Sequence, residues 1–111
     1  MARQSIFDMP VSKVYPLLLA KVERKGRTKD ELDEVIRWLT GYEMDSVDPA
    51  TPYGAFFENA PAMNPRAGLI TGKVCGVDMA SIEDPLMRKI RQLDKLVDEL
   101  AKGRPMEKIL R

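Results

Sequence analysis

The sequence predicts a mainly α-helical protein, folded as a small helical bundle in a single domain over residues 1–111. Two stretches near the N-terminus and one long stretch near the C-terminus carry apolar residues at helical steps of three and four. Capping residues and glycines mark the ends of these stretches. With 111 residues, of which 44% are hydrophobic and 32% charged, the chain can bury one core without disulfides or metal ions.

The two N-terminal stretches predict a helical hairpin or a helix-turn-helix corner. The first helix is expected to begin near Ser12, whose hydroxyl can cap free amides, and to end at Gly26. The second is expected to begin at Thr28, because Thr28 and Glu31 form the capping-box pattern, and to end at Gly41. The apolar faces of the two helices consist of Val14, Leu18 and Val22, and of Leu32, Val35, Ile36 and Leu39.

The middle of the chain is rich in proline and glycine, which are spaced too closely for a long helix. A capping Thr51 before Pro52 predicts one or two helical turns that pack an aromatic trio over the core. The trio consists of Tyr53, Phe56 and Phe57. Further on, apolar residues alternate loosely around Gly72 and predict a small β-hairpin, which must lie on the helices or pair with another chain. These residues are Leu69, Ile70, Val74, Cys75 and Val77, of which the cysteine is expected to be a small buried hydrophobe.

The last third of the chain predicts a long helix from Asp84, with Pro85 in the first helical position, to about Lys102, followed by a terminating Gly103. It carries one apolar stripe, formed by Leu86, Ile90, Leu93, Val97 and Leu100. A final short helix follows, with Met106, Ile109 and Leu110 on one side. So regular a stripe must be buried, either against the chain's own helices or against a second copy of the chain.

A family resemblance covers nearly the whole chain. The segments at residues 14–42 and 82–111, with Val74–Val77 between them, closely resemble the family of domain of unknown function 2200. The strings that carry the resemblance are KGRTK, WLTGY and MEKILR. The resemblance implies a small bacterial or archaeal cytosolic protein, and it supplies no activity, cofactor or catalytic residue.

No catalytic, metal or cofactor pattern stands out in the chain. It has no histidine and one cysteine, which excludes an intrachain disulfide, the usual zinc ligand sets and a Cys/His nucleophile pair. Gly72 and Lys73 lack the upstream glycine of a phosphate loop. We therefore expect no cofactor and no enzymatic activity. No apolar run suits a signal peptide or a membrane span, so we expect a cytoplasmic protein.

A basic cluster surrounds the corner at residues 21–37 and could present positive charge to nucleic-acid phosphates. It comprises Lys21, Arg24, Lys25, Arg27, Lys29 and Arg37. The other interpretation, which we favour, is a solvated face, because four acids lie directly beside these bases: Asp30, Glu31, Asp33 and Glu34. Neither these acids nor Glu43, Asp45 and Asp48 follow a calcium-loop pattern.

The sequence alone names no function. We favour a non-enzymatic protein-interaction module, self-associating as a homodimer through the stripe, the final helix or the hairpin edge. The alternative is a nucleic-acid-binding protein that uses the basic corner; the net charge of +1 counts against it. An enzyme would need a pocket near Tyr42, Tyr53 and Cys75, which sequence cannot show.

Overall fold

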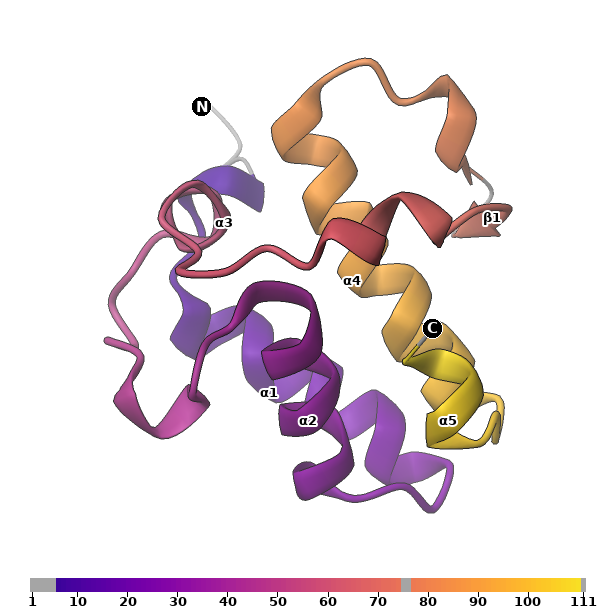
Figure 1. Ribbon diagram of the computed structural model, residues 1–111. Coiled ribbons are helices and arrows are strands. Elements are labelled where there is room, and N and C mark those ends of the chain that lie inside the picture. The colour runs from indigo at the N-terminus through magenta and orange to yellow at the C-terminus, as the bar shows by residue number, and fades with distance from the viewer. Residues whose placement is uncertain (1–5, 75–76, 111) are drawn as a thin grey trace, which may run out of the picture.

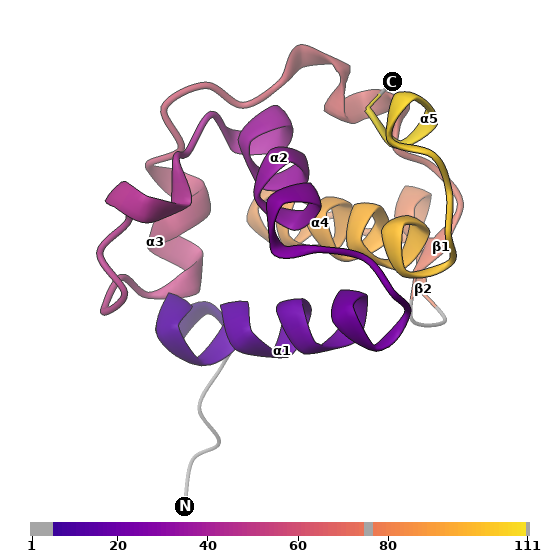
Figure 2. The ribbon, with the colours of Figure 1, turned by 90° about the horizontal axis from the view of Figure 1, so that it is seen from below.

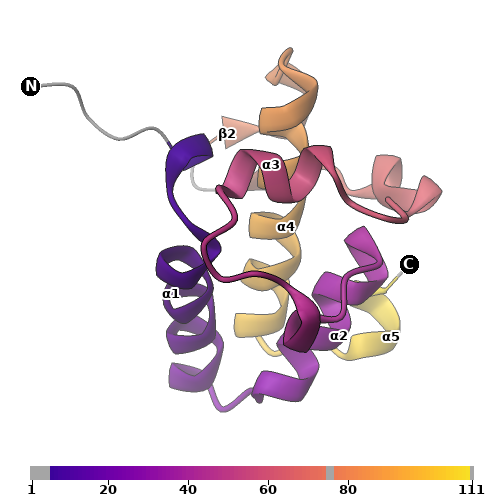
Figure 3. The ribbon, with the colours of Figure 1, turned by 90° about the vertical axis from the view of Figure 1, so that its left-hand side faces the viewer.

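The helix α4 (Pro85–Ala101) is the central element of the molecule, and four other helices contact it (Figure 1). The computed structural model describes residues 6–74 and 77–110. The other helices are α1 (Val11–Arg24), α2 (Lys29–Thr40), α3 (Tyr53–Glu58) and α5 (Met106–Ile109). Figure 3 shows α1 and α4 side by side, with α2 next to them and α3 crossing one end. The predicted mainly helical class is confirmed.

The cap of α1 differs from the prediction, although its start does not. The helix begins at Val11, next to the predicted Ser12, but Pro10 precedes it and no side chain caps it. The backbone amide of Val11 donates to the carbonyl of Thr51 at 2.9 Å, and that of Ser12 donates to Pro49 at 2.9 Å. Carbonyl groups from a distant loop therefore satisfy the free amides that a hydroxyl was expected to satisfy.

Both ends of α2 confirm the prediction. The Thr28 hydroxyl accepts from the Glu31 amide at 3.2 Å, and the Glu31 carboxylate accepts from the Thr28 amide at 3.1 Å. Gly41 ends the helix with φ 82°, a left-handed conformation that glycine adopts without strain. A Cβ at Gly41 would lie 2.8 Å from the Cβ of Ala62, because the following chain returns across the end of α2.

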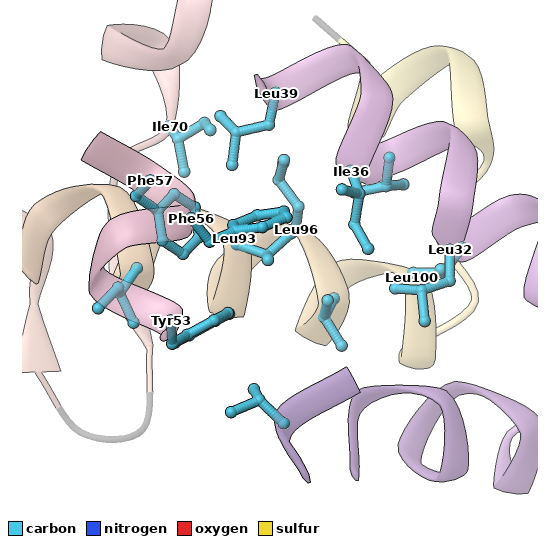
Figure 4. Packing of buried hydrophobic residues seen from close by; sticks show 14 of the residues in the cluster. Leu32, Ile36, Leu39, Tyr53, Phe56, Phe57, Ile70, Leu93, Leu96 and Leu100 are labelled. Atoms are coloured by element: carbon cyan, nitrogen blue, oxygen red, sulfur yellow. The ribbon is translucent and has the colours of Figure 1, made fainter. Parts of the chain in front are cut away.

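The aromatic trio packs into the core as predicted, although Pro52 and not Thr51 precedes α3. Tyr53, Phe56 and Phe57 are all buried (Figure 4). Tyr42 stacks on Phe56 with ring centroids 4.2 Å apart. The Tyr42 hydroxyl also donates to the Phe56 carbonyl at 2.8 Å. These rings close the core at one end of α4.

The segment after α3 corrects the extent of the predicted hairpin. Asn64 and Pro65 begin a 3-10 helix over Pro65–Leu69, and Ile70 is buried in the main core. In the described part of this segment the strands are β1 (Lys73–Val74) and β2 (Val77–Asp78), which pair antiparallel. Leu69 and Ile70 therefore belong to no strand. Cys75, predicted to be buried, lies outside the described residues.

The long helix follows the prediction at both ends. The Asp84 carboxylate accepts from the Leu86 amide at 2.9 Å, Lys102 is the C-cap, and Gly103 adopts φ 88°. Figure 2 shows α4 alongside α1, one of the helices that it contacts. Most of the predicted stripe is buried in the chain's own core, together with Leu96. These buried members are Ile90, Leu93, Val97 and Leu100, while Leu86 is partly buried against the same core. The stripe is therefore not a free surface.

Candidate functional site

The structure ties most of the basic corner into ion pairs. The pairs are Lys21 with Asp98 (3.6 Å), Arg27 with Glu31 (2.7 Å), Lys29 with Asp33 (2.7 Å) and Arg37 with Glu43 (3.5 Å). Within residues 6–74 and 77–110, Arg24 and Lys25 have no acidic partner and are exposed. Two of the six predicted nucleic-acid contacts are therefore fully available to a phosphate.

Arg27 holds the corner in place. Its Nε and Nη2 atoms donate to the Glu31 carboxylate at 3.1 and 2.7 Å, and Nη1 donates to the Arg104 carbonyl at 2.9 Å. The hydrogen bond from Arg27 lowers the pKa of Glu31. Because its side chain is 14% exposed and its fork is already occupied, Arg27 links α2 to the chain before α5.

Acidic residues from two segments converge on a hollow beside this corner. The hollow has a volume of about 310 Å³ and lies between the N-terminal half of α2 and the 3-10 turn Met44–Ser46. It is lined by Asp30, Asp33, Glu34, Arg37, Glu43, Met44 and Asp45. The sequence places these acids in two separate runs. The turn after Gly41 brings the second run back against α2.

An apolar hollow of about 230 Å³ adjoins the acidic one, and the two share Met44 and Asp45. Its apolar lining comes from the start of α1 and from the loop after Met44, namely Val11, Tyr15, Pro16, Val47 and Pro49. We call the two hollows together the acidic groove. The groove is a carboxylate-lined channel with an apolar compartment at one side.

Tyr15, Lys29 and Asp33 form a fixed cluster between the two hollows. The Tyr15 hydroxyl and the Lys29 ammonium both donate to the Asp33 carboxylate, the latter at 2.7 Å, and the ammonium lies 5.8 Å from the Tyr15 ring centroid. Burial and the bond to Asp33 raise the pKa of Tyr15 to about 12. The bond to Asp33 also raises the pKa of Lys29. Both groups therefore keep their protons at neutral pH.

The remaining groove acids are free to interact with a ligand. In the described part of the chain, Asp30, Glu34 and Asp45 make no ion pair with a basic side chain, and all three are exposed. No three ligand-type side chains among the described residues lie close enough together to hold one metal ion. The carboxylates are spread along the groove, an arrangement that suits several cationic groups in a row.

Of the residues considered for an enzyme pocket, Tyr42 and Tyr53 lie in the described part of the chain and Cys75 lies outside it. The Tyr42 hydroxyl donates to a backbone carbonyl, and Tyr53 is 3% exposed, with its ring in the core. The predicted interface residues of the final helix are also used internally: Ile109 is fully buried, while Met106 and Leu110 pack partly against the core. No helix in the described ranges has the length and apolar character needed to cross a membrane.

Comparison with known proteins identifies relatives of the whole chain. The solved structure described as "Crystal structure of uncharacterized protein SP1917" is similar with a TM-score of 0.89 and 46% sequence identity, over 98% of this chain and 93% of that one. No curated protein matches the chain. The family model described as "Uncharacterized protein conserved in bacteria (DUF2200)" matches residues 5–111. The chain therefore belongs to the DUF2200 family, as its sequence resemblance predicted.

Proposed function

We propose that this protein is a non-enzymatic protein-interaction module that binds a basic segment of a partner protein in the acidic groove. The observation that carries the proposal is the convergence of two acidic runs, five carboxylates in all, on one hollow. Two cations line the groove, Lys29 and Arg37, and each already has a carboxylate partner. The groove therefore has a negative excess that complements lysine and arginine side chains.

The apolar compartment supplies the second part of the recognition. It is large enough for one aliphatic or aromatic side chain, and it adjoins the acidic hollow at Met44 and Asp45, which line both. A partner segment with basic residues flanking one apolar residue would satisfy both halves. Charged groups at an exposed rim contribute mainly to association rate and specificity, so we expect a transient complex that weakens with salt.

The test uses fluorescence anisotropy with a labelled peptide in which lysines and arginines flank one leucine. A matched peptide has glutamates in place of the bases. We expect the basic peptide to bind and the acidic one not to bind. The double substitution Glu34→Lys with Asp45→Lys reverses two unpaired groove charges and should weaken binding by about tenfold or more.

A charge-matched control separates the groove from the overall charge of the protein. Glu58→Lys with Glu107→Lys makes the same change in net charge at exposed positions outside the groove, and it should leave binding nearly unchanged. If both double variants weakened peptide binding equally, the acidic groove would not be the binding site. Labelled duplex DNA is measured in parallel. Salt-sensitive DNA binding that disappears in Arg24→Glu with Lys25→Glu would instead support the nucleic-acid alternative.

The protein is proposed to act in the cytosol. A homodimer through the stripe on α4 is not part of this function. The single cysteine and the absence of an intrachain disulfide suit a reducing compartment. We leave the stripe out of the proposed interface because the chain's own helices cover most of its side chains. Self-association through another surface stays a prediction, which sedimentation over a wide concentration range would test.

A further inference from the structure

A separate hollow of about 590 Å³ lies beside the first turns of α4, away from the acidic groove. Its floor is formed by Arg88 and Gln92, one wall by residues 68–72 and the other by residues 78–80. Figure 1 shows residues 79–84 arching away from the helices before α4 begins. The volume is in the range typical of small-molecule sites, roughly 300–1,000 Å³.

The two walls belong to different apolar clusters. Ile70 is part of the main core, while Met79 and Ile82 form a second cluster, and the partly buried Met87 packs against both. The walls are joined by the Met79 amide, which donates to the Gly72 carbonyl at 2.8 Å, and by the antiparallel pairing of Lys73 with Asp78. Packing and hydrogen bonds therefore fix the position of both walls.

Arg88, an exposed residue that lines the hollow, presents a positioned cation. One guanidinium nitrogen of Arg88 donates to the Ile82 carbonyl, which fixes the side chain. Within the part of the chain that the structure describes, no carboxylate lies within ion-pair distance of Arg88, whereas Arg27, Arg91 and Arg104 each have one. The remaining N–H groups of Arg88 are therefore available to an anionic ligand.

The surroundings of Arg88 limit the charge of that ligand. Arg88 is the one cation among the residues that line this hollow, and Asp78 lies on the opposite wall, where its carboxylate accepts from the Ala80 amide at 2.9 Å. A neighbouring hollow of about 300 Å³ shares Arg88 and adds Lys89 together with Glu83, which balance each other. The Lys95 ammonium lies 3.7 Å from the position of a Cβ on Gly72, but it already donates to the Lys73 carbonyl. A dianion such as phosphate would face Arg88 and the nearby Asp78 carboxylate, so a monoanion fits better.

We propose that this hollow binds a small organic carboxylate. The carboxylate accepts hydrogen bonds from Arg88, and the rest of the ligand lies between residues 70–72 and residues 78–80. Planar, two-point recognition of carboxylates is the characteristic strength of a guanidinium group. Gln92 supports the floor, because its Nε2 donates to the Ala67 carbonyl at 3.2 Å and so holds the amide in place.

The test is a titration of the full-length protein followed by two-dimensional amide NMR, with benzoate and hexanoate as probes. Benzyl alcohol and hexanol serve as neutral controls of similar shape. We expect saturable shifts at the amides of Thr71, Gly72 and Ala80 with the carboxylates. The alcohols should bind at least about tenfold more weakly, because a charge-assisted pair is lost.

Two variants test the site, one by removing its cation and one by filling its space. Arg88→Gln removes the cation and should abolish the saturable shifts. Gly68→Leu should block the hollow instead, because Gly68 lines it. A Cβ at Gly68 meets no atom within 4 Å, so the substitution needs no rearrangement of the fold. Arg24→Gln is the matched control, since it removes an exposed and unpaired arginine on α1.

Three outcomes would overturn the proposal: no saturable shift in the wild-type protein, carboxylate binding that persists in Gly68→Leu, or loss of binding in Arg24→Gln. If Arg88→Gln does not fold, Gly68→Leu alone still decides the question. Binding that survives in Arg24→Gln and is lost in the hollow variants would establish the site.

Discussion

Neighbouring acids on α2 have different roles, and their distance from the cap residue decides which role each one has. Glu31 is the third residue after Thr28, so its carboxylate reaches back to the Thr28 amide and also accepts from Arg27. Asp30 lies one residue before Glu31 and Glu34 lies three residues after it, so neither carboxylate accepts from the Thr28 amide. Both line the groove instead. The sequence identifies the capping residue, but it does not show which acids remain unpaired.

We predict that Thr28→Ala lowers the free energy of unfolding by about 1 kcal/mol, because both reciprocal capping bonds are lost. The measurement is urea unfolding followed by circular dichroism. Ser12→Ala is the matched control. Its hydroxyl does not cap α1, so the change should stay within about 0.5 kcal/mol. Equal losses in the two variants would contradict the capping role.

At the scale of elements, local signals predict helix boundaries, and long-range contacts override them. Thr28, Gly41 and Asp84 were predicted correctly because their partners lie within a few residues. The Ser12 cap of α1 was predicted wrongly, because the first amides of the helix donate to the carbonyls of Pro49 and Thr51. No property of the sequence near Ser12 reveals that a distant loop satisfies those amides.

The acidic groove could not be predicted for a similar reason. Its two acidic runs are separated by Gly41, and the direction of the chain after Gly41 depends on tertiary packing. The Ala62 amide donates to the Thr40 carbonyl at 3.0 Å and the Asn64 amide to the Leu39 carbonyl at 2.9 Å, so a later segment occupies the end of α2. The chain must therefore turn away and fold back along the helix.

A pair of glycine variants tests this packing. Gly26 and Gly41 have nearly the same left-handed conformation, with φ 83° and 82°. Gly26→Ala should cost about 1 kcal/mol of unfolding free energy from backbone strain, since nothing lies near its Cβ position. Gly41→Ala should cost at least about 1 kcal/mol more, because its Cβ would collide with Ala62. Equal costs in chemical denaturation would show that the segment at Ala62 yields easily.

At the scale of the whole molecule, α4 organises the core by contributing side chains to every neighbouring helix. Figure 4 shows Leu93, Leu96 and Leu100 between the aromatic residues of α3 and the apolar face of α2. The periodicity of the sequence predicts that this face is buried. The periodicity does not tell whether this face packs against helices of the same chain or of a second copy, because either arrangement would require the same spacing of apolar residues. The helices α1, α2 and α3 supply the cover here.

We predict that Leu96→Ala lowers the free energy of unfolding by about 2–5 kcal/mol, because a fully buried side chain in this shared core leaves a cavity. Leu17→Ala is the control, since Leu17 is 64% exposed on α1 and should change stability by less than about 0.5 kcal/mol. Both are measured by urea unfolding at several protein concentrations. A midpoint that rises with concentration would indicate that a second chain contributes to the core.

The three tyrosines make the folded state sensitive to alkali, and this property can be tested without substituting any core residue. Burial raises the pKa of Tyr42 and of Tyr53, and burial together with the bond to Asp33 raises that of Tyr15 to about 12. An unfolded tyrosine titrates near pH 10, so between about pH 10 and 12 the folded state binds more protons than the unfolded one.

The stability that these phenols contribute is therefore present below about pH 10 and is lost as the pH rises through their folded pKa values. We expect the ultraviolet absorbance of tyrosinate to appear above pH 10 in the native protein and near pH 10 in urea. As the pH rises from about 10 to 12, the free energy of unfolding should fall less in Tyr15→Phe than in the wild type, because the variant lacks one of the groups whose pKa is raised by folding. A native tyrosine that titrates near pH 10 would show that at least one of the three rings is open to solvent.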